Sequence, residues 1–146
     1  MESRTDKTLS YVQFLARRYD KQDVSAVTQV ILYDLGIAPG VDGYIYLRQA
    51  IIMYHAWSVE IVRKMVFPKI SYPYDAGDSK DLVEQAIRRC IRSAWDVRDP
   101  EAWDLFFPPR RGKIRKCPSN KEFIAQISCL IELWQRCKEA THYTEK

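Results

Sequence analysis

The sequence predicts an all-α fold: a compact helical domain of about six helices that contains a helix-turn-helix, plus one extra helix at the N-terminal end. Apolar residues recur at helical spacing in segments separated by Gly, Pro and Asp, and no stretch alternates long enough to form a strand. Of the 146 residues, 47% are hydrophobic, 29% are charged and only 5 are Gly. This composition is typical of one compact domain and excludes a disordered chain, a collagen-like chain or a multi-domain enzyme.

Residues 1–22 are predicted to form a helical extension ahead of a main domain at 23–140, with a C-terminal tail at 141–146. Within the extension, apolar residues predict a helix over about 6–19 because they share one face: Leu9, Val12, Leu15, Ala16 and Tyr19. The polar start of the chain lacks the apolar core of a secretory signal. We therefore expect a cytoplasmic protein.

Two helices are predicted next, over about 24–35 and from about 41 or 43 to 56. Asp23 favours the start of the first as an N-cap, and Gly36 favours its end. The second is apolar on almost all sides, so we expect it to be the central core helix. Its apolar run over 50–54 is five residues long. A membrane-spanning helix needs roughly 20, so we expect no membrane association.

Turn residues divide the next part of the chain. Ser58 favours the start of a helix that Pro68 ends, and a short helical turn and a loop follow before Ser79. From there to Asp96 a strong amphipathic helix is predicted by one apolar stripe: Val83, Ala86, Ile87, Cys90, Ile91, Ala94 and Trp95.

The last part combines a short helix, an irregular arm and a long helix. The short helix is predicted over 100–107 and stops at two prolines, and 110–117 is a loop or an irregular hairpin arm. Ser119 and Glu122 form a capping-box pattern, which predicts that the last helix starts there and continues to about Ala140.

The motifs that define common catalytic and metal sites do not occur. The chain has no phosphate-binding loop, no dinucleotide-binding glycine motif and no zinc-protease motif. His55 and His142 lie outside metal-ligand spacing, and His55 is expected to be a structural histidine. The cysteines form no C-x-x-C pair, and we expect four free thiols: Cys90, Cys117, Cys129 and Cys137. We expect no enzyme, no cofactor, no metal and no small-molecule substrate.

The positive charge is concentrated in one part of the chain. The net charge is +4, and residues 79–116 hold ten Lys and Arg against six Asp and Glu, which equals the whole excess. Five of the seven residues over 110–116 are basic. Such a local excess favours an anionic partner, double-stranded DNA first, although a solvated charged loop would look the same.

The helix predicted over 79–96 has the layout of a helix-turn-helix recognition helix. Its outward stripe holds Leu82, Gln85, Arg89 and Arg92, with Asp81 and Arg88 beside it and Glu84 near its edge. Gln can pair with adenine, Glu can accept from cytosine, Leu can contact the thymine methyl, and Arg can bind guanine or phosphate. An ordinary surface helix with charge pairs remains the alternative.

Four blocks in the chain resemble the DNA-binding effector domain of the sporulation stage zero master regulator of Firmicutes. The most specific is the sequence GYIYLRQAI at 43–51, preceded by LGIAP at 35–39. VEQAIRRCIRSAW at 83–95 is similar to the recognition helix, and CPSNKEFIA at 117–125 is similar to the start of the last helix. The resemblance covers about 24–133.

The resemblance implies a six-helix domain that binds a short DNA box, commonly as tandem head-to-tail copies. It also implies contact with the sigma factor of RNA polymerase through about 96–107. The family's base-reading Arg-x-Glu-Arg pattern maps to Leu82, Glu84 and Gln85, where only the Glu is retained, so we expect a different DNA site. A receiver domain precedes this domain in the family. Here about 22 residues precede it, so we expect no control by aspartyl phosphate.

The leading hypothesis is a DNA-binding transcription regulator with helix 79–96 in the major groove. Leu82, Glu84 and Gln85 would face bases. Basic residues would face phosphates: Lys80, Arg88, Arg89, Arg92, Arg110, Arg111, Lys113, Arg115 and Lys116. The alternative is a protein-binding module or inhibitor, encoded by a mobile element, that keeps the fold without the family's base readout. A homodimer on tandem sites is a further expectation.

Overall fold

The structure is a computed structural model that describes residues 4–41, 43–56, 80–109 and 115–144. The helices in these ranges are α1 (Arg4–Arg18), α2 (Val24–Asp34), α3 (Tyr44–Ala56), α6 (Lys80–Asp96), α7 (Pro100–Phe106) and α8 (Asn120–Thr144). Every regular element of the described ranges is helical, which confirms the all-α prediction. The helix predicted at 58–68 and the turn before Ser79 lie outside the described residues. Among the helices that are described, none is long and apolar enough to cross a membrane.

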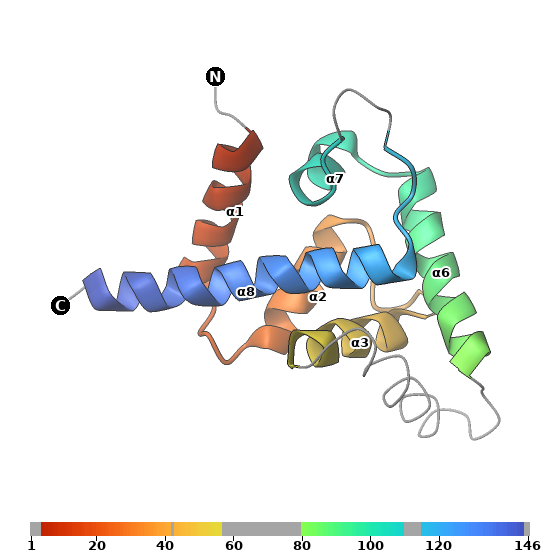
Figure 1. Ribbon diagram of the computed structural model, residues 1–146, viewed down its shortest axis with the longest axis horizontal. Coiled ribbons are helices and arrows are strands. Elements are labelled where there is room, and N and C mark those ends of the chain that lie inside the picture. Colours follow the sequence, from red (N-terminus) through yellow and green to blue (C-terminus); the bar gives the residue numbers. More distant parts are fainter. Residues whose placement is uncertain (1–3, 42, 57–79, 110–114, 145–146) are drawn as a thin grey trace.

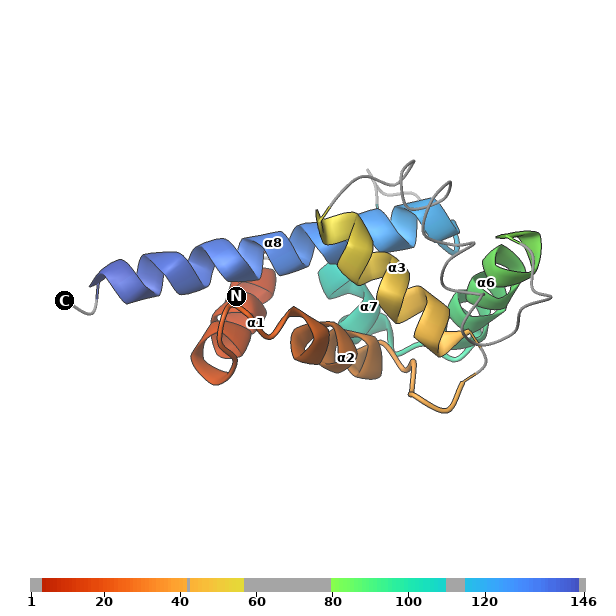
Figure 2. The same ribbon diagram turned by 90° about the horizontal axis from the view of Figure 1, so that it is seen from below.

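The central element is α8, not α3 as the apolar composition of α3 suggested. α8 packs against each of the other five described helices, whereas α3 packs mainly against α2, α6 and α8. Figures 1 and 2 show α1 and α6 at opposite ends of α8, with the C-terminal end of α8 extending beyond α1. One face of α3 stays at the surface, where Ile45 is 39% exposed. The position of a helix depends on its long-range partners, which its own sequence does not specify.

The C-terminal end of α2 is built as predicted. Gly36 has φ +87 and follows the C-cap residue Leu35. The Gly36 N–H donates to the Tyr33 carbonyl at 2.9 Å, and the Ile37 N–H donates to the Leu32 carbonyl at 2.8 Å. This pair of hydrogen bonds is a Schellman motif, which needs a residue that tolerates positive φ.

The N-terminal end of α2 differs from the expectation. Asp23 occupies the N-cap position, but its side chain makes no cap hydrogen bond. By contrast, Asp99 caps α7, since its carboxylate accepts from the Glu101 N–H at 3.1 Å. Pro100, at the first position of α7, needs no partner for a backbone N–H because it has none.

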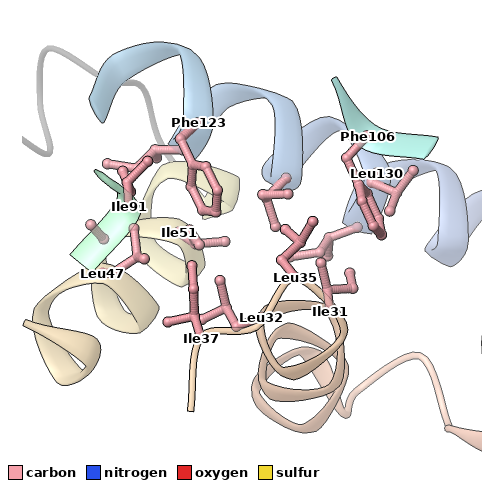
Figure 3. Packing of buried hydrophobic residues seen from close by; sticks show 14 of the residues in the cluster. Ile31, Leu32, Leu35, Ile37, Leu47, Ile51, Ile91, Phe106, Phe123 and Leu130 are labelled. Carbon is pink, nitrogen blue, oxygen red and sulfur yellow. The ribbon is translucent and has the colours of Figure 1, made fainter. Parts of the chain in front are cut away.

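One hydrophobic core joins all six described helices (Figure 3). Ile31 of α2, the C-cap residue Leu35 and Ile51 of α3 are buried below α8, which contributes Phe123 and Leu130. An aromatic group continues the core toward α7: Trp103 lies 5.4 Å from Phe107 and 5.9 Å from Phe123, ring centre to ring centre. The Trp103 indole N–H donates to the Leu35 carbonyl at 3.1 Å, so its polar atom is satisfied.

α1 packs against α8 and α7 within this core. Val12, Leu15 and Ala16 are buried, whereas Leu9, which was expected on the same face, is 43% exposed. The Tyr11 ring meets the Phe106 ring edge to face, with centres 5.5 Å apart. Its hydroxyl donates to the Asp34 carboxylate at 2.6 Å. Burial raises the pKa of Tyr11, and the Asp34 carboxylate raises it further, so the phenol stays neutral.

Candidate nucleic-acid interface

The described side chains of α6 divide into an apolar side and an opposite polar side. The predicted apolar stripe is confirmed: six of its members are buried, namely Val83, Ala86, Ile87, Cys90, Ile91 and Ala94. Trp95, the seventh, is half-buried. The opposite face is exposed and holds Leu82, Gln85, Arg89 and Arg92 as expected, together with Asp81, Ser93 and Asp96. The buried side fixes the helix on the body, which leaves this outer face open to a partner.

Two hydrogen bonds attach α6 to the first residue of α8 and to Pro118, two residues before it. The Asn120 side-chain amide donates to the Glu84 backbone carbonyl at 2.9 Å. The Arg88 guanidinium donates to the Pro118 carbonyl at 2.6 Å. Both bonds lie on the flank of α6 that faces α8, so they set the orientation of α6 without covering its outer face. One N–H of Arg88 is therefore already committed within the protein.

Gly43 allows the start of α3 to approach α6 closely. It has φ +86, and a Cβ placed on it would overlap the carbonyl group of Ala86. Any other residue would therefore push the two helices apart. Neither Gly43 nor Asn120 was among the predicted site residues. Gly43 gave a usable signal, because it directly precedes an apolar helical run, but Asn120 acts through a tertiary contact that no local pattern reveals.

The predicted cations occupy different environments. Arg89 and Lys116 are exposed. Arg92 pairs with Asp96 at 3.7 Å, and both side chains are about 60% exposed, so this surface pair contributes little stability and can rearrange. Arg115 has only 17% of its side chain exposed. Its guanidinium lies 3.4 Å from the Glu122 carboxylate and 5.4 Å above the Phe107 ring.

The side chains of four other predicted cations lie outside the described residues. Arg110, Arg111 and Lys113 lie outside the described residues. The backbone of Lys80 begins α6, but its side chain lies outside the description. The helix that would precede α6 in a helix-turn-helix falls within 57–79 and is likewise outside it.

An open groove runs between the N-terminal half of α6 and the segment before α8, and its walls carry both signs of charge. Asp81, Glu84 and Glu122 line it together with Arg88 and Lys116. The carboxylates make this groove a poor place for a phosphate group, because like charges repel. The exposed Arg89 and Arg92 lie on the outer face and not among the groove-lining residues. The outer face of α6 is therefore a better candidate for phosphate contact than the groove.

His55 has a structural partner outside this interface. His55 shares a 2.8 Å hydrogen bond with the Gln135 side chain, whose amide donates to the Lys21 carbonyl at 3.0 Å. The structural assignment of His55 is therefore confirmed. As expected, none of the four cysteines forms a disulfide. Among the described residues, no group of three or more His, Cys, Asp and Glu could hold a metal ion.

An all-helical domain that fixes one amphipathic helix by its apolar side and exposes its polar side has the arrangement of a helical DNA-binding effector domain. The comparison with protein families agrees. The chain belongs to the family described as sporulation initiation factor Spo0A C terminal, whose model matches residues 27–131. This is a family of helical DNA-binding domains and not of enzymes, and the resemblance predicted over about 24–133 is confirmed. The match begins within α2, so α1 lies outside it.

Proposed function

We propose that this protein is a DNA-binding transcription regulator that places α6 in the major groove of double-stranded DNA. The observation that carries the proposal is the division of α6 into a buried apolar side and an exposed side with Leu82, Gln85 and Arg89. Membership of the Spo0A C-terminal family supports the same partner. The function needs no catalytic group, cofactor or metal, and it would be carried out in the cytoplasm.

The contacts divide between bases and phosphates. Leu82, Glu84 and Gln85 would face base edges. Arg89, Arg92 and Lys116 would contact phosphates, and the arm with Arg110, Arg111 and Lys113 would add to them together with Lys80. Arg88 and Arg115 would mainly hold the interface in shape, since each already binds a group of the protein.

We take the arrangement on DNA and the protein partner from what the resemblance to the family implies. Two copies would bind tandem sites as a homodimer on DNA, and the segment 96–107 would contact a sigma factor. The charged side chains of α7 and its cap are all exposed and acidic: Asp99, Glu101 and Asp104. A basic partner surface would therefore suit α7. The N-terminal extension at 1–22 would support the domain through α1.

Salt dependence tests the electrostatic part of the proposal. Each phosphate contact lowers the logarithm of the binding constant by about 0.9 per logarithmic unit of salt. Arg89→Ala should reduce this slope by about 0.9 on a duplex selected from a random library. Arg17→Ala is the matched control, because Arg17 is exposed on α1, at the other end of α8 (Figure 1). A wild-type slope near zero, or no duplex retained from the library, would contradict the proposal.

The alternative is the protein-binding module or inhibitor encoded by a mobile element. Leu82 is 50% exposed on an otherwise polar face, which also suits a protein interface. Under this alternative, a stoichiometric protein partner would be captured in nuclease-treated lysate while no duplex is bound. Leu82→Ala would then weaken capture of that partner. Family membership favours DNA binding over this alternative.

A further inference from the structure

The outer face of α6 begins with two uncharged side chains, Leu82 and Gln85. Both are exposed, and Leu82 is 50% exposed. They are three residues apart, which is about 4.5 Å along a helix axis. Successive base pairs are about 3.4 Å apart. A helix that lies in the major groove can therefore bring these two side chains to neighbouring base pairs.

Guanine recognition has no support at these two positions. Arg and Lys are the side chains that bind the two acceptor atoms of guanine in the major groove. Among the described side chains of α6, the first basic residue on the exposed face is Arg89, one turn beyond Gln85. Arg88 precedes it, but Arg88 is half-buried and donates to the Pro118 carbonyl.

The neighbouring carboxylates also disfavour guanine at this end of α6. Asp81 is exposed beside Leu82, and Glu84 is half-buried beside Gln85. A guanine at this end of α6 would place its acceptor atoms near these carboxylates, and acceptors repel one another. An adenine presents a donor amino group in the same place. The charge around Leu82 and Gln85 thus disfavours guanine and tolerates adenine.

We infer, on the basis of the proposed function, that Leu82 and Gln85 read two adjacent A·T pairs. Leu82 contacts the C5-methyl group of a thymine. Gln85 donates its amide N–H to adenine N7 and accepts from the adenine N6 amino group. The hydrogen bonds from Arg88 to Pro118 and from Asn120 to Glu84 fix the orientation of α6 on the protein. They therefore keep both side chains directed at the major groove of the DNA.

The first experiment removes the thymine methyl group. The full chain selects duplexes from a random library, and each thymine of the selected site is then replaced by deoxyuridine. At the thymine that Leu82 contacts, the replacement should lower the affinity of the wild type about fourfold. This is the loss expected when one methyl group is no longer buried. Leu82→Ala should bind the thymine and deoxyuridine duplexes equally. Val97→Ala, on an 84% exposed side chain just beyond α6, should keep the fourfold difference.

The second experiment changes the partner of Gln85. Gln85→Glu keeps the shape and the acceptor but loses the donor, so the preferred base at the adjacent position should change from adenine to cytosine. The change in preference should be roughly 5- to 150-fold, as for one bidentate contact. Circular dichroism of each variant checks that the fold is retained, which is expected because both side chains are exposed.

The outcomes separate this inference from the proposed function. A selected site with adjacent A·T pairs, sensitive to deoxyuridine only when Leu82 is present, supports both. Specific binding to a site with G·C pairs there, or a site indifferent to both substitutions, overturns the inference and leaves DNA binding intact. Failure to bind any duplex overturns both.

Discussion

The same residue type has different roles at different positions of the interface. Arg89 is exposed, Arg88 donates to a backbone carbonyl, and Arg115 lies over an aromatic ring beside Glu122. Removing an exposed Arg mainly changes the long-range attraction to phosphate. Removing Arg88 leaves the Pro118 carbonyl without this donor, which costs stability as well as affinity.

Gly43 is the single residue on which the approach of α3 to α6 depends most. We expect Gly43→Ala to lower the free energy of unfolding by about 2 kcal/mol or more. An L-residue at positive φ costs about 1–2 kcal/mol, and the new methyl group also overlaps the Ala86 carbonyl. Urea denaturation followed by circular dichroism measures the loss.

Gly40→Ala provides the control for this substitution. Nothing lies within 4 Å of a Cβ placed on Gly40, so the change should stay within about 0.5 kcal/mol of wild type. Equal free energies of unfolding for the two variants would contradict this prediction. They would mean that α3 can move away from α6 without destabilising the protein.

At the scale of the element, the start of α8 links a helix cap to the interface. The Ser119 hydroxyl accepts from the Glu122 N–H at 3.1 Å and donates to the Glu122 carboxylate at 3.3 Å. The predicted serine cap is therefore confirmed. The carboxylate, however, binds the Ser119 hydroxyl and Arg115, and no bond to the Ser119 N–H is formed in this segment.

We expect Ser119→Ala to destabilise the protein by about 1 kcal/mol, the usual value of a lost N-cap. The loss should appear in the free energy of unfolding from a urea titration. Ser93→Ala is a matched change at an exposed position inside α6 and should be neutral or slightly stabilising, because Ala favours a helix interior. A loss that is the same for both variants would show that the hydroxyl of Ser119 does not cap α8.

Most helices could be predicted because one-sided burial leaves a periodic pattern. All predicted members of the apolar stripe of α6 are buried except Trp95, which is half-buried. The predicted end of α2 at Gly36 is confirmed. Helix ends were less certain, since α8 continues to Thr144 beyond the expected Ala140. Leu9 matches the pattern of α1 but is 43% exposed, so the predicted apolar face of α1 is not buried along its whole length.

The site could be predicted as a face but not as a set of contacts. Periodicity shows that Gln85 and Arg89 point outward, because they lie opposite the apolar stripe. It cannot show that Arg88 meets Pro118 or that Arg115 meets Phe107, because these partners are distant or depend on an irregular segment. The importance of α8 was missed for the same reason.

At the scale of the whole molecule, α1 and α6 are coupled through one core although they lie at opposite ends of α8 (Figures 1 and 2). Buried residues of both helices belong to the same hydrophobic cluster, with α8 between them. The family match begins at residue 27, but the core includes Val12, Leu15 and Ala16 of α1. α1 is therefore part of the folded body, and its packing should support the interface from a distance.

This coupling predicts that damage to α1 weakens the entire protein. Leu15→Ala removes a fully buried side chain and should cost about 2–5 kcal/mol, whereas Leu9→Ala, on a 43% exposed side chain of the same helix, should cost far less. In urea, the transition of Leu15→Ala seen by far-UV circular dichroism should coincide with that seen by tryptophan fluorescence, to which Trp95 and Trp103 contribute. Two separate transitions would mean that α1 unfolds alone. The interface would then depend on the family domain by itself, since the loss of α1 would leave α6 in place.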